Sequence, residues 1–166
     1  MSERYRVRVT KDYLVFSSGH FITYDGDHCE RLHGHNYRAA VEVEAPLDPN
    51  CYVFDFIALK NRMRELTDEL DHHMMVPTKN PILTVTESPK IVRIAYREKE
   101  WVFPREDCVL LPIENTTAEL LAKYLAGRLR EVLKSQHGFT PEVLRVEVEE
   151  SFGQVATYEY STPPHP

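Results

Sequence analysis

The chain has 166 residues, a length that allows one domain with a sizeable hydrophobic core. It carries 20 basic and 26 acidic residues, and the net charge of −6 argues against a nucleic-acid partner, whose phosphates bind clustered basic surfaces. No apolar run follows the first residues, and no segment is long and apolar enough to span a membrane. We therefore expect a cytoplasmic protein that binds neither nucleic acid nor membrane.

The first part of the chain has the residue pattern of β-strands. Residues 5–10 alternate apolar with polar side chains, as in a half-buried strand. A second strand-like segment, residues 13–16, leads to His20. A third predicted strand, residues 33–44, places apolar side chains on one face and charged side chains on the other, and ends near two prolines.

Two histidines in the third predicted strand indicate a metal site. His33 and His35 are two residues apart, so both imidazoles leave one face, which continues with apolar residues as far as Val43. Neutral imidazoles on a buried face are costly unless their nitrogens are bound, and zinc binds them well. A hairpin-like return brings His20 beside His33 as a third ligand. Three nitrogen ligands make a catalytic zinc site with an open fourth position, and the alternative is a pair of surface or hydrogen-bonded histidines.

The next segment is predicted to be a helix. From Phe56 to Leu70, apolar residues recur every three or four positions, and Asp55 is well placed as the N-cap. The helix delivers Asp71 and His72 at its carboxyl end, and this pair adds to the indication of a functional site. The alternative for His72 is a helix-terminal cation that binds the last carbonyl groups.

Residues 77–112 form the least regular part of the chain and are predicted to be an insertion. Their apolar residues suggest one or two strands, with residues 97–100 as a hairpin tip. A second helix follows, in which Thr116 and Glu119 fit a capping box and Gly138 fits the end.

The C-terminal part adds a further predicted strand, residues 144–149. By alternation, Glu150 falls on the apolar face of this strand. Its carboxylate therefore lies either at the solvent-exposed end of the strand or against hydrogen-bond donors. A tail around residues 161–166 is expected to be disordered. The whole pattern predicts one α+β domain over residues 1–166, a small antiparallel sheet with two helices packed on one face. Open sheet edges favour assembly into a homo-oligomer.

Three cysteines cannot all pair with one another, and their spacing fits no metal knuckle. Cys51 and Cys108 have apolar surroundings and are expected to be small buried hydrophobic residues. Cys29 stands among charged residues, which predicts a polar, partly accessible setting in which a thiolate can form.

Several segments together resemble those of one known family. The segments are Phe16-Ser17-Ser18-Gly19-His20, Cys29-x-x-x-His33-Gly34-His35-Asn36-Tyr37, Val53-Phe54-Asp55-Phe56, Leu70-Asp71-His72, Glu114-Asn115 and Glu150-Ser151. On these segments the chain resembles the 6-pyruvoyl-tetrahydropterin synthase and 6-carboxytetrahydropterin synthase family, which adopts the T-fold. The resemblance covers most of the chain, from His20 to Tyr158. It departs from the family at Pro112, where a threonine is usual.

The resemblance implies a zinc-dependent lyase that converts 7,8-dihydroneopterin triphosphate to 6-carboxytetrahydropterin. It implies subunits that form a barrel-like oligomer, a hexamer of two trimers. The implied residues are His20, His33 and His35 for Zn²⁺, Cys29, Asp71 and His72 for catalysis, and Glu150, Glu114 and Ser151 for the pterin.

Other activities stay open. The same family includes enzymes that form 6-pyruvoyl-tetrahydropterin. One branch has a glutamate three residues before the first histidine in place of the cysteine, and is associated with aldolase-like cleavage of dihydroneopterin to 6-hydroxymethyl-dihydropterin. This chain has both Cys29 and Glu30, so the resemblance is compatible with either activity. A zinc-bearing, pterin-binding T-fold module without turnover is the non-enzymatic alternative. The pathway, to a queuosine-type deazapurine, a folate or a biopterin, is likewise open.

Overall fold

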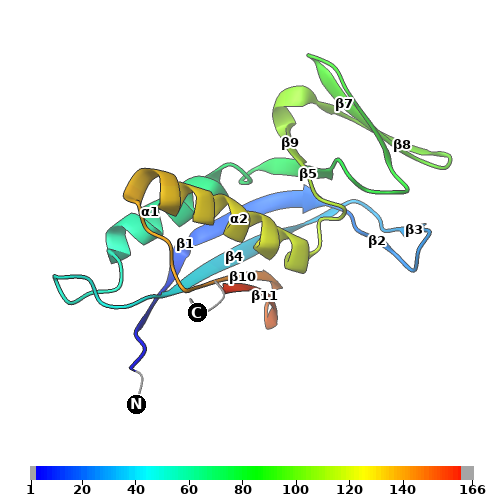
Figure 1. Cartoon of the computed structure of the whole chain (residues 1–166). Coiled ribbons are helices and arrows are strands. Elements are labelled where there is room, and N and C mark those ends of the chain that lie inside the picture. The colour runs from blue at the N-terminus through cyan, green and yellow to red at the C-terminus, as the bar shows by residue number, and fades with distance from the viewer. Residues whose placement is uncertain (1–2, 162–166) are drawn as a thin grey trace.

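In the computed structural model, residues 3–161 are described and form a six-stranded sheet, a small separate sheet, a two-stranded hairpin and two α-helices (Figure 1). The elements in chain order are β1 (Arg6–His20), β2 (Thr23–Tyr24), β3 (His28–Cys29), β4 (His33–Glu44), α1 (Phe56–Asp68), β5 (His73–Pro77), β6 (Thr84–Glu87), β7 (Ile91–Tyr96), β8 (Lys99–Pro104), the 3₁₀ turn η1 (Arg105–Asp107), β9 (Cys108–Leu111), α2 (Ala118–His137), β10 (Val143–Ser151) and β11 (Gln154–Ser161). The predicted tail lies, except for Ser161, outside the described residues.

The main sheet has the strand order β11-β10-β4-β1-β5-β9. Its first four strands are antiparallel, as predicted, and β5 and β9 extend it as parallel strands. The sheet is therefore mixed. The sequence did not predict β5 or β9, because both are short and lack the alternation of a half-buried strand. It also did not predict β11, which pairs with β10 along nearly its whole length.

Two long strands, β1 and β4, form the centre of the main sheet. The two strand-like segments predicted before His20 are one continuous strand, β1, whose pairing with β4 shifts between Thr10 and Val15. On the helix-covered face the rings of Phe16 and Tyr37 stack at 4.9 Å in the main hydrophobic core. The alternation of buried and charged residues along β4 therefore has the parity that the sequence predicts.

Both helices lie side by side on one face of the main sheet (Figure 1). The carboxylate of Asp55 accepts a 2.7 Å hydrogen bond from the Ala58 N–H, so the predicted N-cap of α1 is confirmed. The N-cap of α2 is Thr117, one residue later than predicted, and Thr116 is instead fully buried. Gly138 ends α2 with a positive φ of 61°, as predicted. Within the described residues, neither helix is long and apolar enough to cross a bilayer.

The opposite face of the main sheet carries charged side chains that pair across the strands. Arg145 on β10 contacts Glu42 at 2.7 Å and Glu159 at 2.6 Å, and also binds Glu44. Glu42 is buried, so the guanidinium supplies the partner that a buried carboxylate needs. This face therefore remains polar without unpaired buried charge at Glu42.

A small antiparallel sheet, β6-β7-β8, stands apart from the main sheet, as Figure 1 shows. It lies in the segment predicted to hold one or two strands, and the predicted hairpin tip falls between β7 and β8. The small sheet shares a second hydrophobic cluster with β5 and β9 of the main sheet, and in this cluster Phe21 stacks on Trp101 at 4.6 Å. Since Phe21 directly follows β1, this second cluster begins where the central strand ends.

Candidate metal and active site

Three imidazoles converge at one end of the β1–β4 pair. His20 is the cross-strand partner of His33, and Ser18 is that of His35, as the predicted hairpin-like return requires. One ligand nitrogen from each of the three histidines lies within 4.8 Å of the others. His20 is 1% exposed, whereas His33 and His35 are partly exposed, so the predicted burial holds fully only for His20. A Cβ on Gly34 would meet the Ser18 carbonyl oxygen at 3.0 Å, so the close strand approach needs a glycine there.

The hydrogen bonds of two imidazoles, His20 and His33, leave their Nε2 atoms free to bind a metal ion. His33 Nδ1 lies 2.8 Å from the Arg31 carbonyl oxygen, and His20 Nδ1 lies 3.1 Å from the Thr116 carbonyl oxygen. A carbonyl oxygen only accepts, so each Nδ1 carries the hydrogen and each Nε2 keeps a free lone pair. The two Nε2 atoms face each other at 3.2 Å. Facing lone pairs at this distance repel unless a cation lies beside both, and zinc suits this donor set.

Burial lowers the pKa of His20 to about 4, and the charges of His33 and His35 act in the same direction. The hydrogen bond to Thr116 opposes the shift and is the weaker effect. His20 is therefore neutral at physiological pH, which is the form that binds metals.

Asp71 and His72 contact each other, and His72 lines a cavity together with His33 and His35. Asp71 Oδ1 accepts a 2.7 Å hydrogen bond from the Ser17 N–H, and its Oδ2 lies 2.8 Å from His72 Nδ1. Burial raises the pKa of Asp71, but these hydrogen bonds outweigh it and leave the pKa below its ordinary value. His72 has a positive φ of 58°, held by its N–H bond to the Ser17 carbonyl at 2.7 Å. This strained backbone turns the imidazole to solvent, where it is 82% exposed.

Cys29 and Glu30 follow the β2–β3 hairpin, and they differ in their surroundings. Cys29 is half-buried and packs against the second hydrophobic cluster, with Sγ 3.6 Å from the Glu30 carbonyl oxygen. Burial raises the pKa of the Cys29 thiol, the charge of Lys99 lowers it, and that of Glu30 raises it further. The apolar contact corrects the polar setting predicted for this thiol. Glu30 Oε2 lies 4.0 Å from His33 Nε2. The other cysteine prediction is confirmed for buried Cys108 and wrong for Cys51, which is exposed.

Glu150 points toward the histidines. Its Oε1 lies 3.4 Å from His20 Nε2 and 3.9 Å from His35 Nε2, and it accepts a 3.5 Å hydrogen bond from the Tyr37 hydroxyl. Burial and the charge of Glu150 raise the pKa of Tyr37, so the phenol stays protonated and donates. Of the two alternatives for Glu150, contact with hydrogen-bond donors is therefore the one observed.

Residues of this group line two cavities. One of about 590 Å³ is lined by Ser17, Ser18, Gly19, Leu32, His33, Gly34, His35, Asn36, His72, His73, Met74, Phe103 and Asp107. The other, of about 410 Å³, is lined by Ile22, Thr117, Ala118, Glu119, Glu150, Gln154, Val155 and Ala156. Of the candidate residues, His33, His35 and His72 line the first cavity and Glu150 lines the second. The candidates that line neither are His20, Cys29, Glu30, Asp71, Glu114 and Ser151, and the Glu114 side chain is exposed. Ser151 contacts Gln154 across the β10–β11 turn.

Sequence reasoning missed the role of Thr116. Its carbonyl and hydroxyl oxygens both lie within 3.3 Å of His20 Nδ1, and its hydroxyl donates to the Phe21 carbonyl at 3.2 Å. It therefore orients the buried imidazole. The signal in the sequence, a threonine at the start of a helix, was the same signal that predicted a cap.

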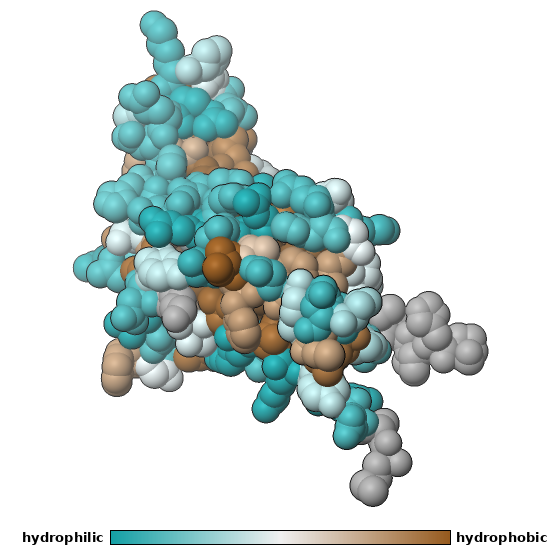
Figure 2. Space-filling view, turned by 90° about the vertical axis from the view of Figure 1, so that its left-hand side faces the viewer, coloured by the Kyte–Doolittle hydropathy of each residue, from teal (hydrophilic) through white to brown (hydrophobic). Residues whose placement is uncertain are grey.

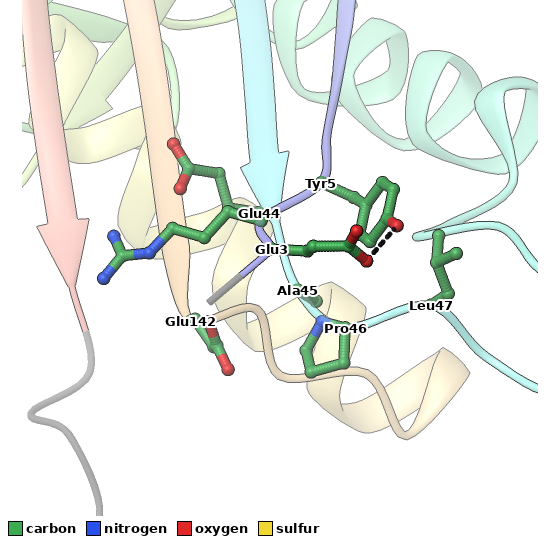
Figure 3. Close-up of a pocket in the computed structure, with 8 residues that line it drawn as sticks. Glu3, Tyr5, Glu44, Ala45, Pro46, Leu47 and Glu142 are labelled. Atoms are coloured by element: carbon green, nitrogen blue, oxygen red, sulfur yellow. Dashed lines mark hydrogen bonds between the residues drawn. The ribbon is translucent and has the colours of Figure 1, made fainter. Parts of the chain in front are cut away.

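A hollow of about 340 Å³ lies at the far end of β4 from the histidines (Figure 3). It is lined by Glu3, Arg4, Tyr5, Glu44, Ala45, Pro46, Leu47 and Glu142. Glu44 is held there by Arg145, and the Tyr5 hydroxyl donates to Glu3 at 2.9 Å. These carboxylates are exposed or paired, and among the residues that the structure describes they form no group with the spacing of metal ligands.

The fold and the histidine group define an α+β T-fold domain with three histidines positioned to bind a metal. A family model described as 6-pyruvoyl tetrahydropterin synthase matches residues 8–161, and the chain belongs to this family. The predicted family and fold class are thereby confirmed.

Similar proteins have names from two branches of this family. A 6-carboxy-5,6,7,8-tetrahydropterin synthase of Aquifex aeolicus is 30% identical over 145 residues, 85% of this chain and 82% of that protein. A relative in Methanocaldococcus jannaschii, 34% identical over 87% of this chain and 89% of its own length, has that name in provisional form. The 6-pyruvoyltetrahydropterin synthase structure of Plasmodium vivax superposes with a TM-score of 0.88 at 29% identity, covering 97% of this chain and all of that one. Two further structures of that protein replace a catalytic glutamate by alanine or by cysteine.

Proposed function

We propose that the protein is a zinc-dependent lyase that converts 7,8-dihydroneopterin triphosphate to 6-carboxytetrahydropterin. The observation that carries the proposal is the convergence of three imidazole nitrogens within 4.8 Å, two of whose histidines share a cavity with His72. The names of the Aquifex and Methanocaldococcus relatives support this product. The family membership supports an enzyme that acts on a pterin.

Zinc held by His20, His33 and His35 would act as a Lewis acid on the side-chain hydroxyls of the substrate. The facing Nε2 lone pairs of His20 and His33 support this ligand set. Thr116 and the Arg31 carbonyl fix the two imidazoles with Nδ1–H outward, so the chain itself supplies the tautomers that the ion requires.

In the proposed function, acid–base roles are assigned to His72 and Cys29. His72 shares with His33 and His35 one cavity of about 590 Å³, which has room for the side chain of a dihydroneopterin. His72 exchanges a proton with the substrate, while Asp71 orients the imidazole and stabilises its charged form. Cys29 is the second group and moves a proton as thiolate.

The pterin ring is proposed to bind in the cavity of about 410 Å³ beside Glu150. Glu150 would accept hydrogen bonds from the amino group and ring N–H of the pterin, which are charge-assisted. Ser151 lies beside it and offers a hydroxyl. Glu114 stays a further candidate contact, although its side chain is exposed and turned to neither cavity.

A second candidate function uses Glu30 in place of Cys29. Glu30 Oε2 lies 4.0 Å from His33 Nε2, whereas Cys29 packs against apolar side chains. The similar Plasmodium vivax structures include variants of a catalytic glutamate. Glu30 would act as the acid–base group in an aldolase-like cleavage of dihydroneopterin to 6-hydroxymethyl-dihydropterin.

Product analysis separates the two functions. Purified protein is supplied with zinc and with either dihydroneopterin triphosphate or its dephosphorylated form, and the pterin products are identified by chromatography. Cys29→Ala should lower formation of 6-carboxytetrahydropterin by about a hundredfold or more, whereas the matched control Cys51→Ser, at an exposed thiol, should leave it unchanged. Glu30→Ala should lower only the formation of 6-hydroxymethyl-dihydropterin, again by about a hundredfold or more. Its control is Glu106→Ala, at an exposed glutamate. Unchanged turnover in Cys29→Ala would refute the primary proposal, and no turnover of any substrate would favour a binding module.

We further expect the subunits to form a homo-oligomer. Within the described residues, β9 and β11 are open edges of the main sheet, and Phe56, Ile57 and Phe152 are 57%, 63% and 94% exposed. Figure 2 shows apolar residues gathered in the middle of one face, framed by hydrophilic ones. Assembly as a hexamer of two trimers would cover such surfaces. Analytical ultracentrifugation tests this, and a monomer at micromolar concentration would contradict it.

A further inference from the structure

The segment that carries the two candidate acid–base residues is not part of the main sheet. We call residues 23–30, which comprise β2, β3 and Glu30, the Cys29 hairpin. Its two strands pair with each other through Thr23↔Cys29 and Tyr24↔His28. Asn115 exchanges two hydrogen bonds with the backbone of Thr23 and fixes the base of the hairpin. These bonds leave the position of the tip undetermined.

The tip of the Cys29 hairpin is bound by the small sheet. Both contacts are made with one residue, Asp27, by side chains at the β7–β8 turn. The Tyr96 hydroxyl donates to the Asp27 carbonyl oxygen, and Arg97 Nη2 donates to the Asp27 carboxylate at 2.6 Å. Tyr96 is 7% exposed, so its hydroxyl is held in a fixed direction by the surrounding cluster. The two bonds therefore fix both the backbone and the side chain of Asp27.

Arg97 occupies a turn position that favours glycine. Its φ is 51°, in the left-handed region, where a residue with a Cβ is strained. The Arg97 side chain is the group that reaches Asp27 across 70 positions of sequence. Because a residue with a Cβ is strained at this position, its side chain is expected to have a role that glycine could not fill. The hydrogen bond from Arg97 to Asp27 is such a role.

Packing between the small sheet and the end of β1 completes the contact. Trp101 on β8 stacks on Phe21, two residues before β2 begins. Cys29 packs against the same hydrophobic cluster, which includes Tyr96. The small sheet thus contacts the entry of the Cys29 hairpin and its tip, and it shares one hydrophobic cluster with Cys29.

We propose that Tyr96 and Arg97 are positioning residues, which hold Asp27 and thereby keep Cys29 packed against the second hydrophobic cluster and Glu30 near His33. The assignment of acid–base roles to Cys29 and Glu30 rests on the proposed function. The positioning itself is a property of the folded chain and can be measured without turnover. The small sheet is then part of the active enzyme and not an appendage to it.

The experiment measures how freely Cys29 reacts. Iodoacetamide alkylation is followed in a Cys51→Ser background, since Cys51 is the exposed thiol and Cys108 is buried. The variants are Tyr96→Phe, Arg97→Gly and Arg97→Lys in the zinc-supplied protein. Measurement over a range of pH separates a change in thiol pKa from a change in accessibility. The thermal midpoint, kcat and KM for dihydroneopterin triphosphate are measured in parallel.

The expected results differ between a positioning and a merely structural role. Arg97→Gly should relieve backbone strain, so the thermal midpoint should stay equal or rise. Cys29 should nevertheless be alkylated about threefold faster, because the exposed ion pair between Arg97 and Asp27 is lost. Tyr96→Phe should raise the rate by about tenfold, since a buried hydrogen bond is lost. In both variants kcat should fall while KM changes little. Arg97→Lys should behave as the wild type.

The matched control is Arg93→Ala on the same small sheet, where Arg93 binds Glu100 and not the hairpin. Unchanged alkylation in both Tyr96→Phe and Arg97→Gly, or an equal increase in Arg93→Ala, would overturn the proposal. If the wild type turns over no pterin, the proposed function fails, and the alkylation rates alone decide whether Tyr96 and Arg97 position the hairpin.

Discussion

Zinc is expected to stabilise the metal-free protein strongly, because its ligands already face one another. The Nε2 atoms of His20 and His33 lie 3.2 Å apart, and the His35 nitrogen lies within 4.8 Å of both. At a free zinc concentration about a hundredfold above Kd, binding adds about 2.7 kcal/mol to the free energy of unfolding. For a chain of this length, each kcal/mol raises Tm by about 2–4 °C. The thermal midpoint should therefore rise by about 5–11 °C.

The assay is differential scanning calorimetry of chelator-treated protein with and without added zinc at neutral pH. His35→Ala removes one of the three ligands and should lose most of the shift. His137→Ala is the control, because this exposed histidine ends α2 and is not one of the three grouped histidines. An equal Tm with and without zinc in the wild type would refute the reasoning, as would a full shift in His35→Ala.

Three other changes test separate parts of the structure. Gly34→Ala places a Cβ 3.0 Å from the Ser18 carbonyl oxygen and should lower the free energy of unfolding by about 1–3 kcal/mol, measured by urea denaturation. Arg145→Met removes a charged hydrogen-bond partner from buried Glu42 and should cost about 1.5–3 kcal/mol in the same assay. The pKa of Asp71 is lowered in the folded protein, so its stabilising effect is present above the unfolded pKa of about 3.9 and is lost as the pH falls through the folded value. Asp71→Asn should therefore make unfolding, followed in urea at a series of acidic pH values, depend less steeply on pH.

Local sequence patterns predicted the centre of the fold well. Alternation along residues 33–44 predicted which side chains of β4 face the core. Asp55 and Gly138 predicted the start of α1 and the end of α2. These signals were reliable because they act within a few residues. The strands β5 and β9 were missed, since their parallel pairing depends on contacts far apart in the chain and leaves no alternation.

The histidine group was predictable because its signal is also local. Two histidines at strand spacing share a face wherever the strand lies, so His33 and His35 needed no tertiary information. The environment of Cys29 was not predictable in this way. Its sequence neighbours are charged, but in the fold it packs against a hydrophobic cluster whose members come from distant segments. Thr116 was likewise assigned to a cap, because the proximity of its carbonyl to His20 arises only when α2 docks.

The pairing of His20 with His33 has a consequence for the order of folding. All three histidines of the candidate metal site belong to β1 and β4, which are joined by only 12 residues, so the candidate ligand set exists as soon as these two strands align. Loop closure over so short a segment is entropically cheap compared with bringing in α2. An ion bound at this stage would fix the register of β1 and β4 before the helices pack on the sheet. The concentration of available metal would then affect the folding of the chain as well as the activity of the folded protein.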